Sequence, residues 1–190
     1  MQKLIIATGN AGKLKEFKDM LSGKFDVLGL KDIGYLPKCE ENGKTFEENA
    51  FIKADEIYKI TGENVLADDS GLCVFALNGA PGVYSARYAG EHATADECNA
   101  LLLKNLNGIT DRRAYFECCL AFIRSNGERI STFGRTDGEI LLKPQGTDGF
   151  GYDPLFYSDD LKKSFGIASE QEKNAVSHRG RALRELVKKI

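Results

Sequence analysis

The chain of 190 residues contains no tryptophan, only two histidines and no Cys-x-x-Cys pair. Structural zinc sites are built from closely spaced cysteine and histidine ligands, so we expect no zinc centre. Basic side chains are not in excess either, because the formal net charge is −2. This balance argues against a protein that binds duplex nucleic acid and against an acidic, solvating tail.

The sequence also lacks a long apolar run. No stretch is long enough to cross a bilayer, and the run that follows Met1 is too short for a signal peptide. The five cysteines, an odd number, indicate reduced thiols. We therefore expect a cytoplasmic protein with neither a membrane nor a nucleic acid as partner. What is present, 42% hydrophobic and 28% charged residues, is typical of a globular domain.

Apolar periodicity and turn residues predict an α/β fold. A glycine turn joins the first strand to the first helix, and capping boxes begin the helices at Thr45 and Thr94. Asn126-Gly127 is a hairpin signal between two long strands, so the sheet is expected to be mixed. The predicted helices lie from residue 14 to 21, 45 to 60, 94 to 106 and 177 to 190. The predicted strands lie at 3–8, 25–30, 65–67, 72–77, 113–125, 128–135 and 139–142.

The segment from Thr8 to Lys13 follows the first strand and opens the first helix. A helix N-terminus presents free backbone N–H groups to an anion, and Lys13 adds a positive charge. The glycine spacing is not that of a P-loop. An ordinary turn with a solvated lysine explains the same residues, so this segment alone leaves phosphate binding open.

Two acidic pairs suggest metal chemistry. Glu40 and Glu41 precede the Thr45 helix, and Asp68 and Asp69 are expected at the end of a strand. Carboxylates can hold Mg²⁺ together with several waters, while a spare carboxylate accepts a proton from water. If the strand continues, Asp68 and Asp69 project to opposite sides and only one faces the ion. A solvated loop and a capped turn are the alternatives.

Aromatic and cationic residues gather in the last third of the chain. The segment from Phe150 to Asp153 offers rings for base stacking beside a carboxylate, or else a structural turn with core aromatics. Ser177 is expected to cap the last helix, which places His178 and Arg179 in its first turn. Such donors suit a base edge or a phosphate, although the polar start of a surface helix would look the same.

Together, these segments resemble the inosine triphosphate pyrophosphatase family, in its bacterial branch of noncanonical purine nucleoside triphosphate (dITP/XTP) pyrophosphatases. The resemblance implies an elongated two-lobed α/β fold, one domain over 1–190, with a long mixed sheet flanked by helices and a central active-site cleft. It implies Mg²⁺-dependent hydrolysis of ITP, dITP and XTP to the monophosphate and pyrophosphate by a cytoplasmic homodimer. The matching stretches follow the family order at residues 8–13, 45–54, 67–72, 79–88, 149–154 and 172–179.

The resemblance also implies roles for individual residues. Asp69 would accept the proton of the attacking water, with Asp68 in support, and Glu41 and Asp69 would bind the metal. The family reads Glu-Thr-Gly where this chain has Glu41-Asn42-Gly43, so Glu40 stays open as the metal-side acid. The substrate would contact Thr8, Gly9, Asn10, Ala11, Gly12, Lys13, Lys53, Ser70, Phe150, Gly151, Tyr152, Asp153, Lys173, His178 and Arg179.

Within this set, His178 and Arg179 would read the 6-oxo group of the purine. A donor aimed at position 6 accepts a keto oxygen, whereas the amino group of adenine would place donor against donor. Two other functions stay open. A pyrophosphatase for modified pyrimidine nucleotides would share the fold plan, and a nucleotide-sensing module would bind without turnover. A covalent mechanism is not expected, since Ser70 has no nucleophile-elbow context.

Overall fold

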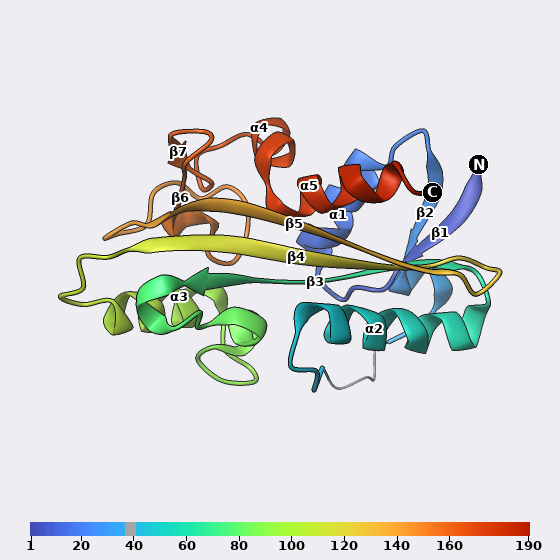
Figure 1. Ribbon diagram of the computed structural model, residues 1–190, viewed down its shortest axis with the longest axis horizontal. Helices are drawn as coiled ribbons and strands as arrows, with labels where there is room; N and C mark the ends of the chain where they lie inside the picture. The colour runs from blue at the N-terminus through green and yellow to red at the C-terminus, as the bar shows by residue number, and fades with distance from the viewer. Residues whose placement is uncertain (37–40) are drawn as a thin grey trace. The chain divides into compact units, whose positions relative to one another are not determined.

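A mixed β-sheet organises the chain (Figure 1). The computed structural model describes residues 1–36 and 41–190. Its seven strands are ordered β2-β1-β3-β4-β5-β6-β7. β1 pairs in parallel with β2 and β3, and β6 pairs antiparallel with β5 and β7, which confirms the predicted mixed sheet. The strands are β1 (Gln2–Ile6), β2 (Phe25–Gly29), β3 (Asn64–Val74), β4 (Arg113–Ile123), β5 (Arg129–Ile140), β6 (Phe156–Ser158) and β7 (Lys163–Ser164).

The helices begin where short polar side chains can cap them. The Thr45 hydroxyl accepts the N–H of Glu48, as predicted, although the Glu48 carboxylate accepts the N–H of Lys44. The Thr94 capping box is complete. No helix in the described part of the chain is long and apolar enough to cross a membrane. The helices are α1 (Ala11–Met20), α2 (Phe46–Thr61), α3 (Ala95–Asn105), α4 (Glu170–Val176) and α5 (His178–Val187), with 3-10 turns η1 (Leu30–Ile33), η2 (Phe75–Leu77), η3 (Gly82–Arg87) and η4 (Asp153–Leu155).

Two strand predictions were wrong in the same way. The strands expected at 65–67 and 72–77 are parts of one strand, β3, which continues through Asp68 and Asp69 and ends at Val74, and residues 75–77 form η2 instead. Those carboxylates are tolerated inside the sheet because each is paired with a lysine. The strands expected at 128–135 and 139–142 are likewise one strand, β5. Its Gly138 allows close pairing, since a Cβ there would lie 2.2 Å from the Tyr157 carbonyl oxygen.

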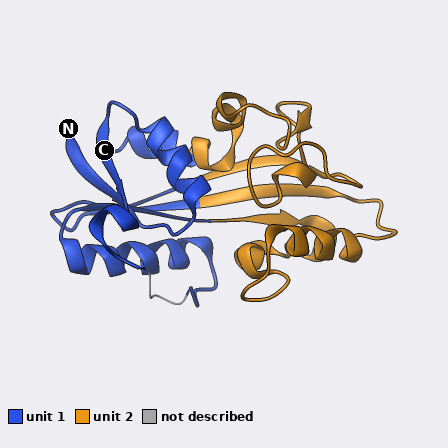
Figure 2. Ribbon diagram, turned by 180° about the vertical axis from the view of Figure 1, so that it is seen from behind, with its two compact units in different colours: residues 1–69, 119–133, 182–190 blue, residues 70–118, 134–181 orange. Residues whose placement is uncertain are grey.

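Two compact units divide the chain (Figure 2). Unit 1 comprises residues 1–69, 119–133 and 182–190. In its core, Ala50, Ala54 and Ile57 of α2 pack against β1, β3 and β4. The helix α1 lies on the opposite side of β3 (Figure 1). Cys119 belongs to the core under α2 and the adjacent Cys118 does not, in agreement with their predicted orientation to opposite faces.

Unit 2 comprises residues 70–118 and 134–181 and has an aromatic core. The rings of Phe116 and Phe156 have centroids 4.7 Å apart, and those of Phe156 and Phe165 are 5.1 Å apart. Residues of α3 complete this core. The predicted last helix is preceded by a separate helix, α4, whose N-cap Ser169 and Glu172 form a capping box.

Candidate active site

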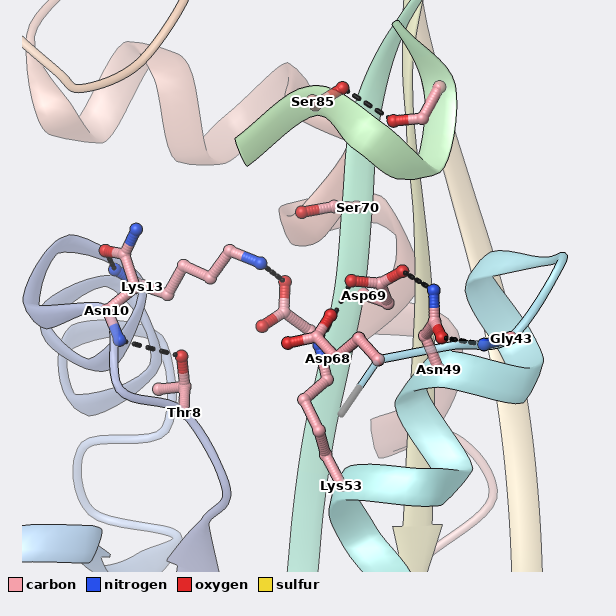
Figure 3. Close-up of polar contacts among 12 residues, drawn as sticks. Thr8, Asn10, Lys13, Gly43, Asn49, Lys53, Asp68, Asp69, Ser70 and Ser85 are labelled. Carbon is pink, nitrogen blue, oxygen red and sulfur yellow. Dashed lines mark hydrogen bonds and ion pairs between the residues drawn. The ribbon is translucent and has the colours of Figure 1, made fainter. Parts of the chain in front are cut away.

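The two aspartates of β3 point to opposite faces of the sheet, as strand alternation predicts (Figure 3). Asp68 is paired with Lys13 of α1, whose Nζ lies 3.0 Å from Oδ2. Asp69 is paired with Lys53 of α2, whose Nζ lies 3.0 Å from Oδ1. Each buried carboxylate therefore meets a lysine from the helix on its own face.

The segment from Thr8 to Lys13 forms the start of α1, where the sequence predicts an anion site. Asn10 is the N-cap residue, because its Oδ1 accepts the backbone N–H of Lys13 at 3.1 Å. The Thr8 hydroxyl oxygen in turn accepts the N–H of Asn10 at 3.2 Å. The first turn reads Ala-Gly-Lys-Leu, so no acid opposes an anion at the positive end of the helix. The other exposed or partly exposed residues of the segment are Gly9, Ala11 and Gly12.

Asp69 has contacts through both of its carboxylate oxygens. Besides its pairing with Lys53, its Oδ2 accepts a hydrogen bond from Asn49 Nδ2 at 3.2 Å. The same Lys53 ammonium lies 3.0 Å from Oε2 of Glu41. One ammonium group thus joins two carboxylates, and an amide fixes the second oxygen of Asp69.

These contacts shift the proton affinities of the group. Burial raises the pKa of Asp69 to about 6, against the lowering effect of Lys53 and Lys13 and with a further rise from Glu41. Burial lowers the pKa of Lys53, but Asp69, Asp68 and Glu41 outweigh it and hold that pKa above its ordinary value. Lys53 stays charged, while Asp69 can exchange a proton near neutral pH.

Asn49 is a residue of this group that the sequence analysis missed. It is fully buried on α2, and its Oδ1 accepts the N–H of Gly43 at 2.8 Å. A Cβ on Gly43 would lie 2.6 Å from that oxygen, so the loop that carries Glu41 needs glycine there. The available signal was an asparagine next to the buried Ala50. The alternative acid, Glu40, lies outside the described residues.

The donor set suits a magnesium ion. In residues 1–36 and 41–190, no three acidic, histidine or cysteine side chains are gathered as a ready metal site. Glu41 and Asp69 are nevertheless both 3.0 Å from a single cationic group, the Lys53 ammonium. Hard carboxylate oxygens, completed by water, are the ligands that Mg²⁺ prefers. Glu41 and Asp69 therefore fit the ion as its protein ligands.

Unit 2 brings together a second group of predicted residues. Lys173 and Asp153 form an ion pair of 2.7 Å between Nζ and Oδ2. Oδ2 also accepts the backbone N–H of Phe150 at 2.8 Å. The Lys173 ammonium lies 4.5 Å from the centroid of the Phe150 ring, in a cation–π contact. The ion pair thus holds the loop and one face of its aromatic ring.

The first turn of α5 is buried, unlike the start of a surface helix. Ser177 caps it, since its Oγ accepts the N–H of Gly180 at 3.1 Å. His178 is stacked on Phe116, with ring centroids 4.8 Å apart. Arg179 is 1% exposed and donates to the hydroxyl oxygen of Ser70 at 2.9 Å. Both side chains predicted to read a base are therefore held in fixed positions.

Two further predicted substrate contacts have clear structural surroundings. Tyr152 belongs to the core of unit 2, and its hydroxyl donates to the Ser85 carbonyl oxygen at 2.8 Å. Burial raises the pKa of Tyr152, so its hydroxyl remains a donor. Gly151 adopts φ +63°, a left-handed conformation that favours glycine. Phe150 is thus the half-buried ring of this loop, while Tyr152 anchors it.

Comparison with known proteins agrees with this arrangement. The model of the Ham1 family matches residues 4–189. The chain belongs to the Ham1 family. A Bacillus licheniformis protein named dITP/XTP pyrophosphatase is 50% identical over 189 residues, which span 98% of this chain and 96% of that protein. An Exiguobacterium protein of the same name is 51% identical over 189 residues, spanning 99% and 96% of the two chains.

Solved structures of the family share the fold. The Staphylococcus aureus Ham1 protein gives a TM-score of 0.87 at 41% identity and covers 97% of this chain and 96% of its own. A Mycobacterium abscessus protein described as a nucleoside-triphosphatase or dITP/XTP pyrophosphatase gives 0.77 at 41% identity, covering 97% and 98%. The family resemblance read from the sequence and the predicted α/β fold with its mixed sheet are both confirmed.

Proposed function

We propose that this chain hydrolyses the noncanonical purine nucleoside triphosphates ITP, dITP and XTP to the monophosphate and pyrophosphate, with Mg²⁺. The observation that carries the proposal is the buried Asp69 carboxylate, whose pKa is about 6, beside Lys53 and Glu41. Relatives with about half of their residues in common are named dITP/XTP pyrophosphatase, which supports the same class of hydrolase here.

Asp69 is the proposed proton acceptor. A general base works best when its pKa lies near the working pH, as that of Asp69 does. The oxygen of the attacking water bonds to the α-phosphorus, and the water proton passes to the carboxylate. The bond between the α-phosphorus and the oxygen that bridges it to the β-phosphorus breaks, and pyrophosphate leaves with that oxygen. Asn49 and Lys53 each hold one oxygen of Asp69 and so orient it. Asp68 supports the group by positioning Lys13.

The start of α1 is the proposed triphosphate site. Within the segment from Thr8 to Lys13, the N–H groups of Thr8, Asn10 and Lys13 already donate to acceptors of the chain, so the N–H groups of Gly9, Ala11 and Gly12 are the ones that suit phosphate oxygens. Lys13 and Lys53 now hold carboxylates and can exchange them for phosphate oxygens when the substrate binds. When bound by Glu41 and Asp69, Mg²⁺ would neutralise charge on the phosphates and polarise the reacting phosphoryl group.

The buried group of unit 2 is the proposed base site. Phe150 offers a ring face for stacking, and Lys173 and Asp153 fix the loop that carries it. Arg179 and His178 supply donors for a 6-oxo group, and neither can easily move to suit adenine. The remaining proposed contacts are Ser70, Gly151 and Tyr152.

We also propose a single functional domain over residues 1–190, working as a cytoplasmic homodimer. The family model and the relatives span nearly the whole chain, which supports one functional domain. Light scattering on the purified chain tests the dimer, which predicts twice the 20.9 kDa chain mass.

A nucleotide panel tests the proposed reaction. The purified chain is incubated with Mg²⁺ and ITP, XTP, dITP, ATP, GTP or modified pyrimidine triphosphates, and the products are separated. We expect monophosphate and pyrophosphate from ITP, XTP and dITP. Orthophosphate as the sole phosphate product would sink the proposal, a preference for modified pyrimidines would favour the related pyrophosphatase, and binding without product would favour a sensing module.

A further inference from the structure

Asn99 on α3 reaches the loop of the proposed base site from outside it. Its side chain is 8% exposed, and its Nδ2 donates to the backbone oxygen of Gly151 at 3.0 Å. The orientation of the amide follows from chemistry, because a carbonyl oxygen only accepts and the atom facing it must carry hydrogen. The buried Oδ1 accepts no hydrogen bond from the described residues. The side chain therefore makes one directed contact, to Gly151.

The loop that receives this hydrogen bond needs restraint. Gly149 and Gly151 have φ of +76° and +63°, so Phe150 stands between two glycines in the left-handed region. Glycine has the largest conformational freedom to lose on ordering. Asp153 fixes the N–H of Phe150 from one side. Asn99 fixes the Gly151 carbonyl, one residue further along the chain.

The position of the Phe150 ring depends on both tethers. The ring centroid lies 4.5 Å from the Lys173 ammonium and 5.8 Å from the Arg179 guanidinium carbon. A small rotation of the loop backbone would change both distances, because Phe150 lies between the peptide that Asp153 holds and the Gly151 carbonyl, one peptide further along, that Asn99 holds. Orientation within a fraction of an ångström is what a recognition site requires.

We propose that Asn99 is a positioning residue for nucleobase recognition, which acts through Gly151 to hold the Phe150 ring against the purine. The inference rests on the proposed function, since it needs a purine at Phe150. Loss of the tether weakens binding of the base and leaves the phosphate and proton-transfer residues of unit 1 unchanged.

Two substitutions test the role of Asn99. Asn99→Asp keeps the size of the side chain but replaces the N–H donor with an oxygen, which would face the Gly151 carbonyl. Asn99→Ala removes the tether and introduces the best helix former. Both variants should raise KM for ITP by about tenfold, the equivalent of one good hydrogen bond, with kcat reduced less than about twofold.

The decisive readout is the ratio of kcat/KM for ITP to kcat/KM for ATP. Because ATP gains little from the base site, this ratio should fall by about fivefold or more in both variants. A purely structural role would lower both values by the same factor. The ratio does not depend on the folded fraction of a preparation, so a less stable variant still reports on the role.

The matched control is Asn105→Ala, on the same helix. Asn105 donates to the hydroxyl of the partly buried Tyr88 at 2.7 Å, and Tyr88 is not among the proposed site residues. Its ratio should equal that of the unaltered chain. An unchanged ratio in both Asn99 variants would overturn the inference alone. An unaltered chain that does not prefer ITP to ATP would overturn the proposed function, and the inference with it.

Discussion

The two groups of charged residues differ in how their charges are compensated. In unit 1, Lys13 and Lys53 pair with carboxylates at 3.0 Å while their own side chains remain 15% and 13% exposed. In unit 2, Lys173 and Asp153 pair at 2.7 Å with side chains only 6% and 4% exposed, under an aromatic ring. The lysines of the first group are therefore more accessible to solvent than Lys173, whereas the carboxylates of Asp68 and Asp69, 0% and 8% exposed, are buried much as that of Asp153 is.

This difference fits two kinds of task. A more exposed lysine can reach a phosphate oxygen, and the buried carboxylate that it leaves then needs another cation or a proton to compensate its charge. A fully buried pair is expensive to separate, so it acts as a fixed frame. The group of unit 1 is therefore suited to binding and reaction, and the group of unit 2 to recognition by a preorganised surface.

The largest expected effect is the loss of turnover in Asp69→Asn. An asparagine keeps the shape of the side chain but cannot accept the water proton, so pyrophosphate release from ITP should fall by at least about 10³-fold. Circular dichroism should show an intact fold. The exposed acid of α1 provides the control, and Asp19→Asn should retain full activity. A fully active Asp69→Asn enzyme would remove this carboxylate from the mechanism.

The next effect is on stability. Lys173→Met leaves Asp153 as a buried charge and should cost about 3 kcal/mol or more, measured by urea unfolding. The control is Lys163→Met, which removes an ion pair with Glu172 whose side chains are 31% and 44% exposed. That loss should be below about 1 kcal/mol. Equal losses would contradict the view of unit 2 as the rigid group.

Added Mg²⁺ should affect the two groups of charged residues differently. Lys53→Met leaves Glu41 and Asp69 without their shared ammonium, and a divalent cation can compensate both carboxylates. Added Mg²⁺ should therefore restore much of the stability lost in Lys53→Met and none of that lost in Lys173→Met. Thermal melting with Mg²⁺ or with a chelator checks this. Rescue of neither variant would argue against a cation site at these carboxylates.

Local sequence signals predicted most of the fold. The Thr45 and Thr94 caps and the Asn126-Gly127 hairpin depend on contacts a few residues apart, and the structure confirms the caps and a continuous strand on either side of the hairpin. The prediction failed at β3, where Asp68 and Asp69 are typical of a turn but lie within the strand. The lysines that compensate them come from distant helices, which no local pattern shows. β6 and β7 are too short to leave a periodic signal.

In the candidate site, too, the sequence predicted features that depend on local geometry and missed those that depend on long-range contacts. Strand alternation predicted the opposite orientation of Asp68 and Asp69, because it follows from the backbone alone. Asn49 and Asn99 were missed because their hydrogen bonds, to Asp69 and Gly151, join buried helix positions to residues far away in the sequence. An asparagine within the buried stripe of a helix is the signal that could have identified both.

After the effects on turnover and stability, the next largest expected effect is on base selectivity. Arg179→Ala or His178→Ala removes a charge-assisted or ring donor, and the ITP-to-ATP ratio of kcat/KM should fall by about tenfold to a hundredfold. The inhibition constant of inorganic tripolyphosphate, which has no base, should change less than about twofold. An unchanged nucleotide preference in both variants would refute their role in reading the base.

The last prediction concerns the pH dependence of the free energy of unfolding. It tests whether the buried charge of Asp69 destabilises unit 1 when no metal or substrate is bound. Burial raises the pKa of Asp69 from 3.8 to about 6, so the folded chain binds a proton more tightly there than the unfolded chain does. Stability contributed at this site is therefore present below pH ~4 and is lost as the pH rises to ~6. Between pH 4 and pH 7.5, the stability of Asp69→Asn relative to the unaltered metal-free chain should therefore rise by about 2 kcal/mol. Urea unfolding with a chelator measures both, and a difference that is the same at the two pH values would show that the Asp69 charge imposes no cost.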